Sequence, residues 1–298
     1  MYAQQDRFTN GGDFARYAAA AGFDAIEISH STNEAKLRQL LEADVLPVTS
    51  VHQPAPWKRH RDGRASPDCN IASLVAEERR AGISYATDSI AWAARIGADR
   101  VVVHLGQVTD LPGMFPEERE MRRMFDADRT GEPRFGELRE LAISRRMAAA
   151  EPYVEAARLS LLEIIQAAEP TGVRIGLENR YHFHEIPLPD EYDRILDGID
   201  PAQAGYWHDT GHAEVLHRLG FVDRSAWFAA NSARTIGAHL HDVVGIGDHR
   251  APGDGDVDWS YIAAGLGHLS SYTLEINQHQ SDALVAGAPA FLSSVGLR

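Results

Sequence analysis

The 298-residue chain is long enough for one large α/β domain or two ordinary ones, and 44% of its residues are apolar, which suffices for a full core. Its 29 Lys and Arg against 43 Asp and Glu give a formal net charge of −14, which opposes tight binding to a polyanion such as DNA. The single cysteine, Cys69, excludes an internal disulfide. Because no signal peptide and no run of about 18 apolar residues is found, we expect a cytoplasmic protein with no membrane span.

Short stretches with strand character alternate with helical segments in the first half of the chain. The first dozen residues contain no convincing strand, and a helix is expected at 13–21. Strands are predicted at 23–29, 47–52 and 100–106, with helices at 33–43 and 70–96 between them. Residues 107–134 are charged and carry several prolines, so we interpret them as a lid-like insertion between a strand and the following helix.

The alternation continues in the second half. A helix is expected at about 136–169, where Pro152 predicts a break or a new start. Further strands are predicted at 174–179, at 204–212 running into a tight turn, at 235–242 and at 272–276. A glycine-rich loop is expected at 243–256, then a helix beginning at Trp259 and a C-terminal helix from about residue 281.

This pattern of seven strands alternating with helices, without a run of hairpins, favours an all-parallel α/β fold. The glycine-rich phosphate-binding motifs typical of open doubly wound sheets do not follow any of these strands. We therefore predict one (β/α)₈ TIM barrel over residues 1–298, with a short or degraded first strand and a helical or loop insertion after the fourth strand.

Ionisable side chains recur where the predicted strands end. Six of the seven strands carry His, Asp or Glu near the carboxyl end, namely His52, His104, Glu178, Asp209, His239 and Glu275, and the remaining strand carries Glu27. The carboxyl ends of parallel barrel strands converge on one face, where barrel enzymes hold their active sites. So many carboxylates and imidazoles in one place require a divalent cation, and the absence of a thiolate argues against structural zinc.

The segments VHQP, VVVHLG, LEN, HDTGH, HLHD, HRAPGDG and LEI together resemble the xylose isomerase-like barrel superfamily, which contains sugar and sugar-phosphate isomerases and epimerases, inosose dehydratases and endonuclease IV. The resemblance covers nearly the whole chain, except the N-terminus and residues 107–134. It implies that the four metal ligands of the epimerases are matched here by Glu178, Asp209, His239 and Glu275. It further implies an acid/base pair, Glu178 and Glu275, and substrate-binding residues among His52, His104, His212 and His249.

For several other polar residues, a structural role is an alternative to a role in binding substrate. Arg180 follows the ligand strand and is a candidate to hold a substrate carboxylate or phosphate, with an ion pair to Glu185 or Asp209 as the alternative. The loop residues His182 and His184 could reach substrate or be solvated. His241 lies two residues beyond His239 and points into the pocket or its mouth.

The expected activity is isomerisation or epimerisation of a sugar, a polyol-derived ketone or a phosphorylated relative. The reaction would pass through an enediolate and depend on a divalent ion such as Mn²⁺, Co²⁺, Mg²⁺, Fe²⁺ or Zn²⁺. The sequence predicts a small-molecule substrate and no nucleic-acid partner. It leaves the exact substrate and the oligomeric state open, a homo-oligomer included.

Two alternatives remain. One is a phosphodiesterase similar to endonuclease IV, in which His52 and His104 would hold a second zinc beside Glu178, and His212 and His249 would be ligands of a third. This chain departs from the nuclease in two places, because Gly247 replaces the aspartate of its DxH motif and NRYHFHEIP replaces its TAGQG run. The other alternative is a non-catalytic descendant or a lyase similar to inosose dehydratase, which would eliminate water from the same enediolate.

Overall fold

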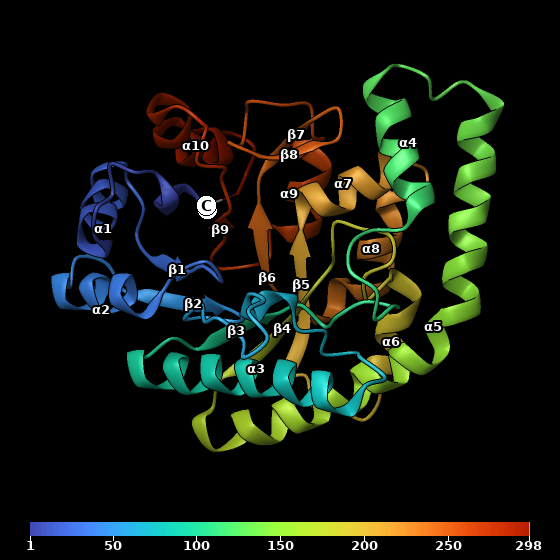
Figure 1. Cartoon of the computed structure of the whole chain (residues 1–298). Coiled ribbons are helices and arrows are strands. Elements are labelled where there is room, and N and C mark those ends of the chain that lie inside the picture. Colours follow the sequence, from blue (N-terminus) through green and yellow to red (C-terminus); the bar gives the residue numbers. More distant parts are fainter. Residues whose placement is uncertain (298) are drawn as a thin grey trace.

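Seven parallel strands form the central sheet in the computed structural model, which describes residues 1–297 (Figure 1). The sheet curves into a barrel with the strand order β1-β2-β3-β4-β5-β6-β9, so sequential strands are neighbours, as a (β/α)₈ barrel requires. The strands span Ile26–Ile28 (β1), Val48–His52 (β2), Arg100–Val103 (β3), Arg174–Glu178 (β4), Ala204–Asp209 (β5), Thr235–Leu240 (β6) and Thr273–Leu274 (β9). All seven predicted strands are confirmed, and each is shorter than predicted.

Helices cover the outside of this sheet (Figure 1), with α1 packed beside α2 and α3 beside α5. Side-chain caps mark several of their starts, as where Asn10 accepts a hydrogen bond from the Asp13 amide and Ser281 from the Leu284 amide. The helices span Gly11–Ala20 (α1), Glu34–Ala43 (α2), Ala76–Ile96 (α3), Pro116–Asp126 (α4), Pro133–Ala168 (α5), Tyr192–Ile195 (α6), Thr210–Arg218 (α7), Arg224–Asn231 (α8), Trp259–Leu266 (α9) and Asp282–Ser294 (α10). Among residues 1–297, none of these helices has both the length and the apolar character needed to cross a bilayer.

One indole side chain fills the barrel interior beneath the polar face. Trp207 of β5 is buried and packs with Val102 and Ile236. A Cβ atom added to Gly176 on β4 would lie 2.8 Å from the Trp207 ring, and one added to Gly237 on β6 would lie 2.1 Å from it. The glycine two residues before Glu178 therefore makes room for the tryptophan that supports the site from below.

The first barrel strand is missing from residues 1–297. A 3₁₀ turn at Tyr2–Gln4 stands where a short or degraded strand was expected, and β1 and β9 have no strand between them. The polar opening residues lack the alternation of a buried strand, which explains this outcome. A cavity of about 820 Å³ lies along the two edge strands and is lined by residues of both, and by residues of α1 and α10.

Four further predictions need correction. Pro152 lies inside one continuous helix, α5, which runs from Pro133 to Ala168. Figure 1 shows that this helix bends along its length. Residues 70–75 are not helical. The tight turn after β5 is the first turn of α7, capped by the Asp209 carboxylate. The glycine-rich loop contains a hairpin of β7 (Asp242–Val244) and β8 (Gly247–Arg250), and the Asp242 carboxylate accepts hydrogen bonds from the Gly253 and Val257 amides that follow the hairpin.

Candidate metal and catalytic site

Four side chains from four strands meet at the carboxyl end of the barrel. We call Glu178, Asp209, His239 and Glu275 the central cluster, because their candidate ligand atoms all lie within 4.8 Å of one another. Glu178 and Asp209 end β4 and β5, His239 lies near the end of β6, and Glu275 directly follows β9. The structure thus brings together the four residues that the family resemblance indicates, and all four are buried.

The His239 ring is the centre of this cluster. Its Nδ1 lies 2.6 Å from Glu178 Oε1, 3.2 Å from Glu275 Oε2 and 3.9 Å from Asp209 Oδ2. Burial alone would lower the pKa of His239, but the neighbouring carboxylates of Glu27, Glu178 and Glu275 raise it well above its usual value. Burial likewise opposes ionisation of Glu178, yet His239 and His104 hold its pKa well below the usual range. The carboxylates of the cluster therefore stabilise a positive charge placed among them, such as that of a protonated imidazole or a cation.

Arg180 supplies further positive charge from the loop after β4. One of its terminal nitrogens donates to Glu178 Oε2 at 2.7 Å and also contacts His104, while its Nε donates to Glu185 Oε1 at 3.2 Å. The sequence analysis gave an ion pair with Glu185 as the alternative to substrate binding by Arg180, and this ion pair is present. The guanidinium is therefore committed to protein carboxylates.

A second group lies on the β2 and β3 side of Glu178. His52 Nε2 and His104 Nε2 are 2.6 Å apart, and His104 Nε2 is 2.7 Å from Glu178 Oε2. His30, in the loop after β1, adds a third imidazole, with its Nδ1 3.4 Å from His52 Nδ1. The candidate ligand atoms of His52, His104 and Glu178 form a second set within 4.8 Å.

A third group lies beyond Asp209. Candidate ligand atoms of His212, His241 and His249 also lie within 4.8 Å of one another, and the His241 and His249 rings stack with centroids 4.3 Å apart. His241 Nδ1 accepts the His249 amide hydrogen at 2.9 Å, so its Nε2–H donates to the Asp209 carboxylate at 2.9 Å. His241 therefore lies inside the site, where it orients a member of the central cluster.

The last two candidate histidines, His182 and His184, face the 107–134 segment. His182 Nδ1 lies 3.1 Å from Glu118 Oε1, and His184 Nδ1 lies 4.0 Å from Glu118 Oε2. Glu118 is a fully buried residue of α4 that also accepts hydrogen bonds from Arg122 and from the Phe183 amide. The 107–134 segment is thus joined to the loop after β4 through one buried carboxylate.

Replacing Glu118 tests this connection. Glu118→Gln should lower the free energy of unfolding by about 3 kcal/mol at neutral pH, because it leaves the buried Arg122 and the partly buried His182 without their anion. Glu117→Gln on the same helix is the matched control, since its partner Arg145 is exposed, and should cost less than about 1 kcal/mol. Denaturant unfolding measures both, and equal effects would contradict the assignment.

The pH dependence of the same carboxylate has a definite sign. Burial would raise the pKa of Glu118, but His182, His184 and Arg122 hold it well below its usual value. Its stabilising contribution is therefore complete above the unfolded-state pKa of about 4.3 and is lost as the pH falls further. Wild-type protein should lose more stability than Glu118→Gln as the pH is lowered below that value.

Two residues of the site were not assigned a role from the sequence. Glu27 on β1 lies 2.8 Å from His239 Nε2, and His30 follows two residues after that strand. Glu27 alternates with the apolar Ile26 and Ile28, so a carboxylate on the inner face of a strand was a readable signal. His30 had none, because it stands outside the periodic pattern.

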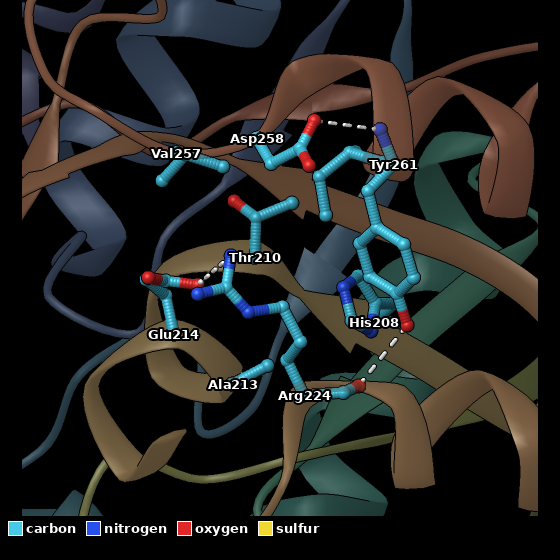
Figure 2. A pocket seen from close by; sticks show the side chains of 9 residues that line it. His208, Thr210, Ala213, Glu214, Arg224, Val257, Asp258 and Tyr261 are labelled. Carbon is cyan, nitrogen blue, oxygen red and sulfur yellow. Dashed lines mark hydrogen bonds and ion pairs between the residues drawn. The ribbon is translucent and has the colours of Figure 1, made fainter. Parts of the chain in front are cut away.

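A small cavity behind α7 is distinct from this site. Figure 2 shows its lining, in which Glu214 pairs with Arg224 and the Asp258 carboxylate accepts the Tyr261 amide hydrogen. Its volume of about 10 Å³ is that of one water molecule, so it excludes a sugar. The cavity of about 820 Å³ is lined in part by Glu275 and Glu27 and reaches the central cluster from the side.

Comparison with known proteins agrees with this architecture. The family described as xylose isomerase-like TIM barrel matches residues 15–294. An uncharacterized protein of Methanocaldococcus jannaschii is 24% identical over 249 residues, which cover 81% of this chain and 69% of that protein. The inosose dehydratase of Geobacillus kaustophilus is 27% identical over 152 residues, 43% of this chain and 47% of the enzyme. The solved structure of a D-tagatose 3-epimerase-like protein matches with a TM-score of 0.65 and 21% identity, covering 93% of this chain and 91% of that one.

Proposed function

Because the chain belongs to the xylose isomerase-like TIM barrel family, we propose that it is a divalent-metal-dependent sugar isomerase or epimerase. The observation that carries this proposal is the central cluster, in which three carboxylates and one imidazole from four strands lie within 4.8 Å of one another. The likeness to a D-tagatose 3-epimerase-like protein extends over 93% of the chain and supports the same class of reaction.

The donor set of the central cluster fits a divalent cation. Three buried carboxylates at this distance repel one another, and His239, His104 and Arg180 are among the neighbouring groups that offset this repulsion. Oxygen and imidazole donors without a thiolate suit Mn²⁺, Co²⁺, Mg²⁺ or Zn²⁺. Glu178, Asp209, His239 and Glu275 would hold the ion.

The same carboxylates provide the proton chemistry. A divalent ion bound here would polarise a substrate carbonyl and make the adjacent C–H bond more acidic. Glu178 and Glu275 come from β4 and from the end of β9, and one would accept the proton while the other returns a proton to the same or the neighbouring carbon. His52, His104, His212 and His249 surround the cluster and would hydrogen-bond substrate hydroxyl groups.

The ion pairs of Arg180 favour an unphosphorylated substrate. A phosphate group would have to compete with Glu178 and Glu185 for this guanidinium, and both carboxylates already contact it. The formal net charge of −14 also opposes the approach of an anionic substrate. We therefore propose a neutral ketose or a polyol-derived ketone.

Product analysis in D₂O tests this proposal. Metal-loaded protein is incubated with a panel of free ketoses and inososes, and the products are followed by NMR. The proposal expects a new epimer or isomer that carries deuterium at the inverted or receiving carbon, because the carboxylates exchange protons with solvent. Loss of water without epimer formation would replace it with the dehydratase assignment, which the Geobacillus kaustophilus relative supports.

The two histidine groups favour a second candidate, a phosphodiesterase. His52 and His104 beside Glu178, and His212 with His241 and His249, have the spacing of two additional ion sites. Two or three ions would suit activation of water against a phosphodiester. Two observations weigh against a phosphodiester substrate: Arg180 is already paired with Glu178 and Glu185, and the net charge of the chain is negative.

A further inference from the structure

The Glu27 carboxylate lies on the opposite side of the His239 ring from the central cluster. Its Oε1 is 2.8 Å from His239 Nε2, whereas His239 Nδ1 lies 2.6 Å from Glu178 Oε1. Each ring nitrogen thus has its own carboxylate neighbour, one behind the ring and one within the cluster. The arrangement separates a nitrogen that holds the ring in place from a nitrogen that faces the candidate ligands.

Glu27 is itself held by the neighbouring strand. Its Oε2 accepts a hydrogen bond from Ser50 Oγ at 2.6 Å, and Glu27 and Ser50 are register partners in the β1–β2 pair. The Glu27 side chain is 7% exposed. Both carboxylate oxygens are therefore occupied by donors in a buried position, and the acceptor that faces His239 has a fixed direction.

We propose that Glu27 is a positioning residue that fixes the orientation and tautomer of His239. It keeps the proton on Nε2, so that Nδ1 is the nitrogen available to a metal ion in the central cluster. This inference rests on the proposed metal-dependent function and deepens it. A carboxylate behind a metal-binding imidazole makes the imidazole more basic, and its removal typically weakens metal binding by about 10- to 100-fold.

A different arrangement would make Glu27 a ligand. Candidate ligand atoms of Glu27, His52 and His239 also lie within 4.8 Å of one another. In that case the metal would bind His239 through Nε2, and the proton would move to Nδ1. The two arrangements assign opposite tautomers to one ring, so they can be told apart without measuring turnover.

The test measures Mn²⁺ binding by calorimetry in the absence of substrate. Glu27→Gln should raise the dissociation constant by about 10- to 100-fold, and Ser50→Ala should raise it in the same direction by less. Glu214→Gln is the matched control, because it alters a buried carboxylate paired with Arg218 and Arg224 outside the cluster. It should reduce thermal stability and leave the Mn²⁺ affinity unchanged.

Unchanged affinity in Glu27→Gln would overturn the inference and leave the proposed function standing. A wild-type protein that binds no divalent metal would overturn the proposed function and the inference together. The tautomer gives an independent result if Glu27→Gln does not fold. ¹⁵N NMR of the wild-type protein with Zn²⁺ should show His239 protonated at Nε2, and a proton on Nδ1 would overturn the assignment.

Discussion

Glu178→Gln and Glu275→Gln should each reduce kcat by about 10³-fold or more while the fold stays intact. Each substitution removes a charge and a proton acceptor from a buried position but little volume, and general acid–base groups contribute about 10²- to 10⁴-fold to rate. Steady-state kinetics on the substrate found by product analysis, with circular dichroism as the fold check, measures both effects. Full activity in either variant would contradict the acid/base assignment.

Metal binding must be separated from proton transfer in these variants. Asp209→Asn serves this purpose, because Asp209 is a proposed ligand without a proposed part in proton transfer. Its activity should recover at high Mn²⁺ concentration, whereas Glu178→Gln and Glu275→Gln should stay inactive when saturated with metal. Glu117→Gln, which alters a carboxylate of α4 outside the central cluster, should behave as wild type throughout. If all three cluster variants regained activity at high Mn²⁺ concentration, Glu178 and Glu275 would be metal ligands with no part in proton transfer.

Removal of the divalent metal by a chelator should abolish turnover, and added Mn²⁺ or Co²⁺ should restore it. The physical reason is the charge balance of the central cluster, which gathers three carboxylates around His239. Removal should leave the protein folded, because His239 and Arg180 still neutralise part of that charge. Activity assays before and after chelation, with metal content measured on the same samples, test this, and an apo protein with unchanged activity would rule the metal out.

The sequence was sufficient to predict the barrel because period-two apolar stretches and helical segments alternate along the chain. It also indicated the central cluster. Glu178 and Asp209 end their strands, His239 and Glu275 lie within one residue of a strand end, and parallel strands bring those ends to one face. Position along a strand is a local property, so a local reading could find these residues.

Features that depend on tertiary contacts could not be predicted in the same way. The contact between α4 and the loop after β4 depends on the buried carboxylate of Glu118. This residue lies in a charged helix, and its sequence suggests that the Glu118 side chain is exposed to solvent. The β7–β8 hairpin lies in a stretch whose glycines suggested a loop, and the Asp242 carboxylate holds the chain after it by accepting the Gly253 and Val257 amides. The strand before β1 is missing because the opening residues are polar, which the sequence shows. The cavity along the two edge strands follows only from the three-dimensional arrangement.

The number and position of bound ions test the central claim most directly. Anomalous diffraction from crystals of the Mn²⁺-loaded protein should show one strong peak among Glu178, Asp209, His239 and Glu275, with His52, His104, His212 and His249 free to face substrate. Peaks also lying between His52, His104 and Glu178, or among His212, His241 and His249, together with cleavage of a phosphodiester by the same preparation, would contradict the isomerase assignment.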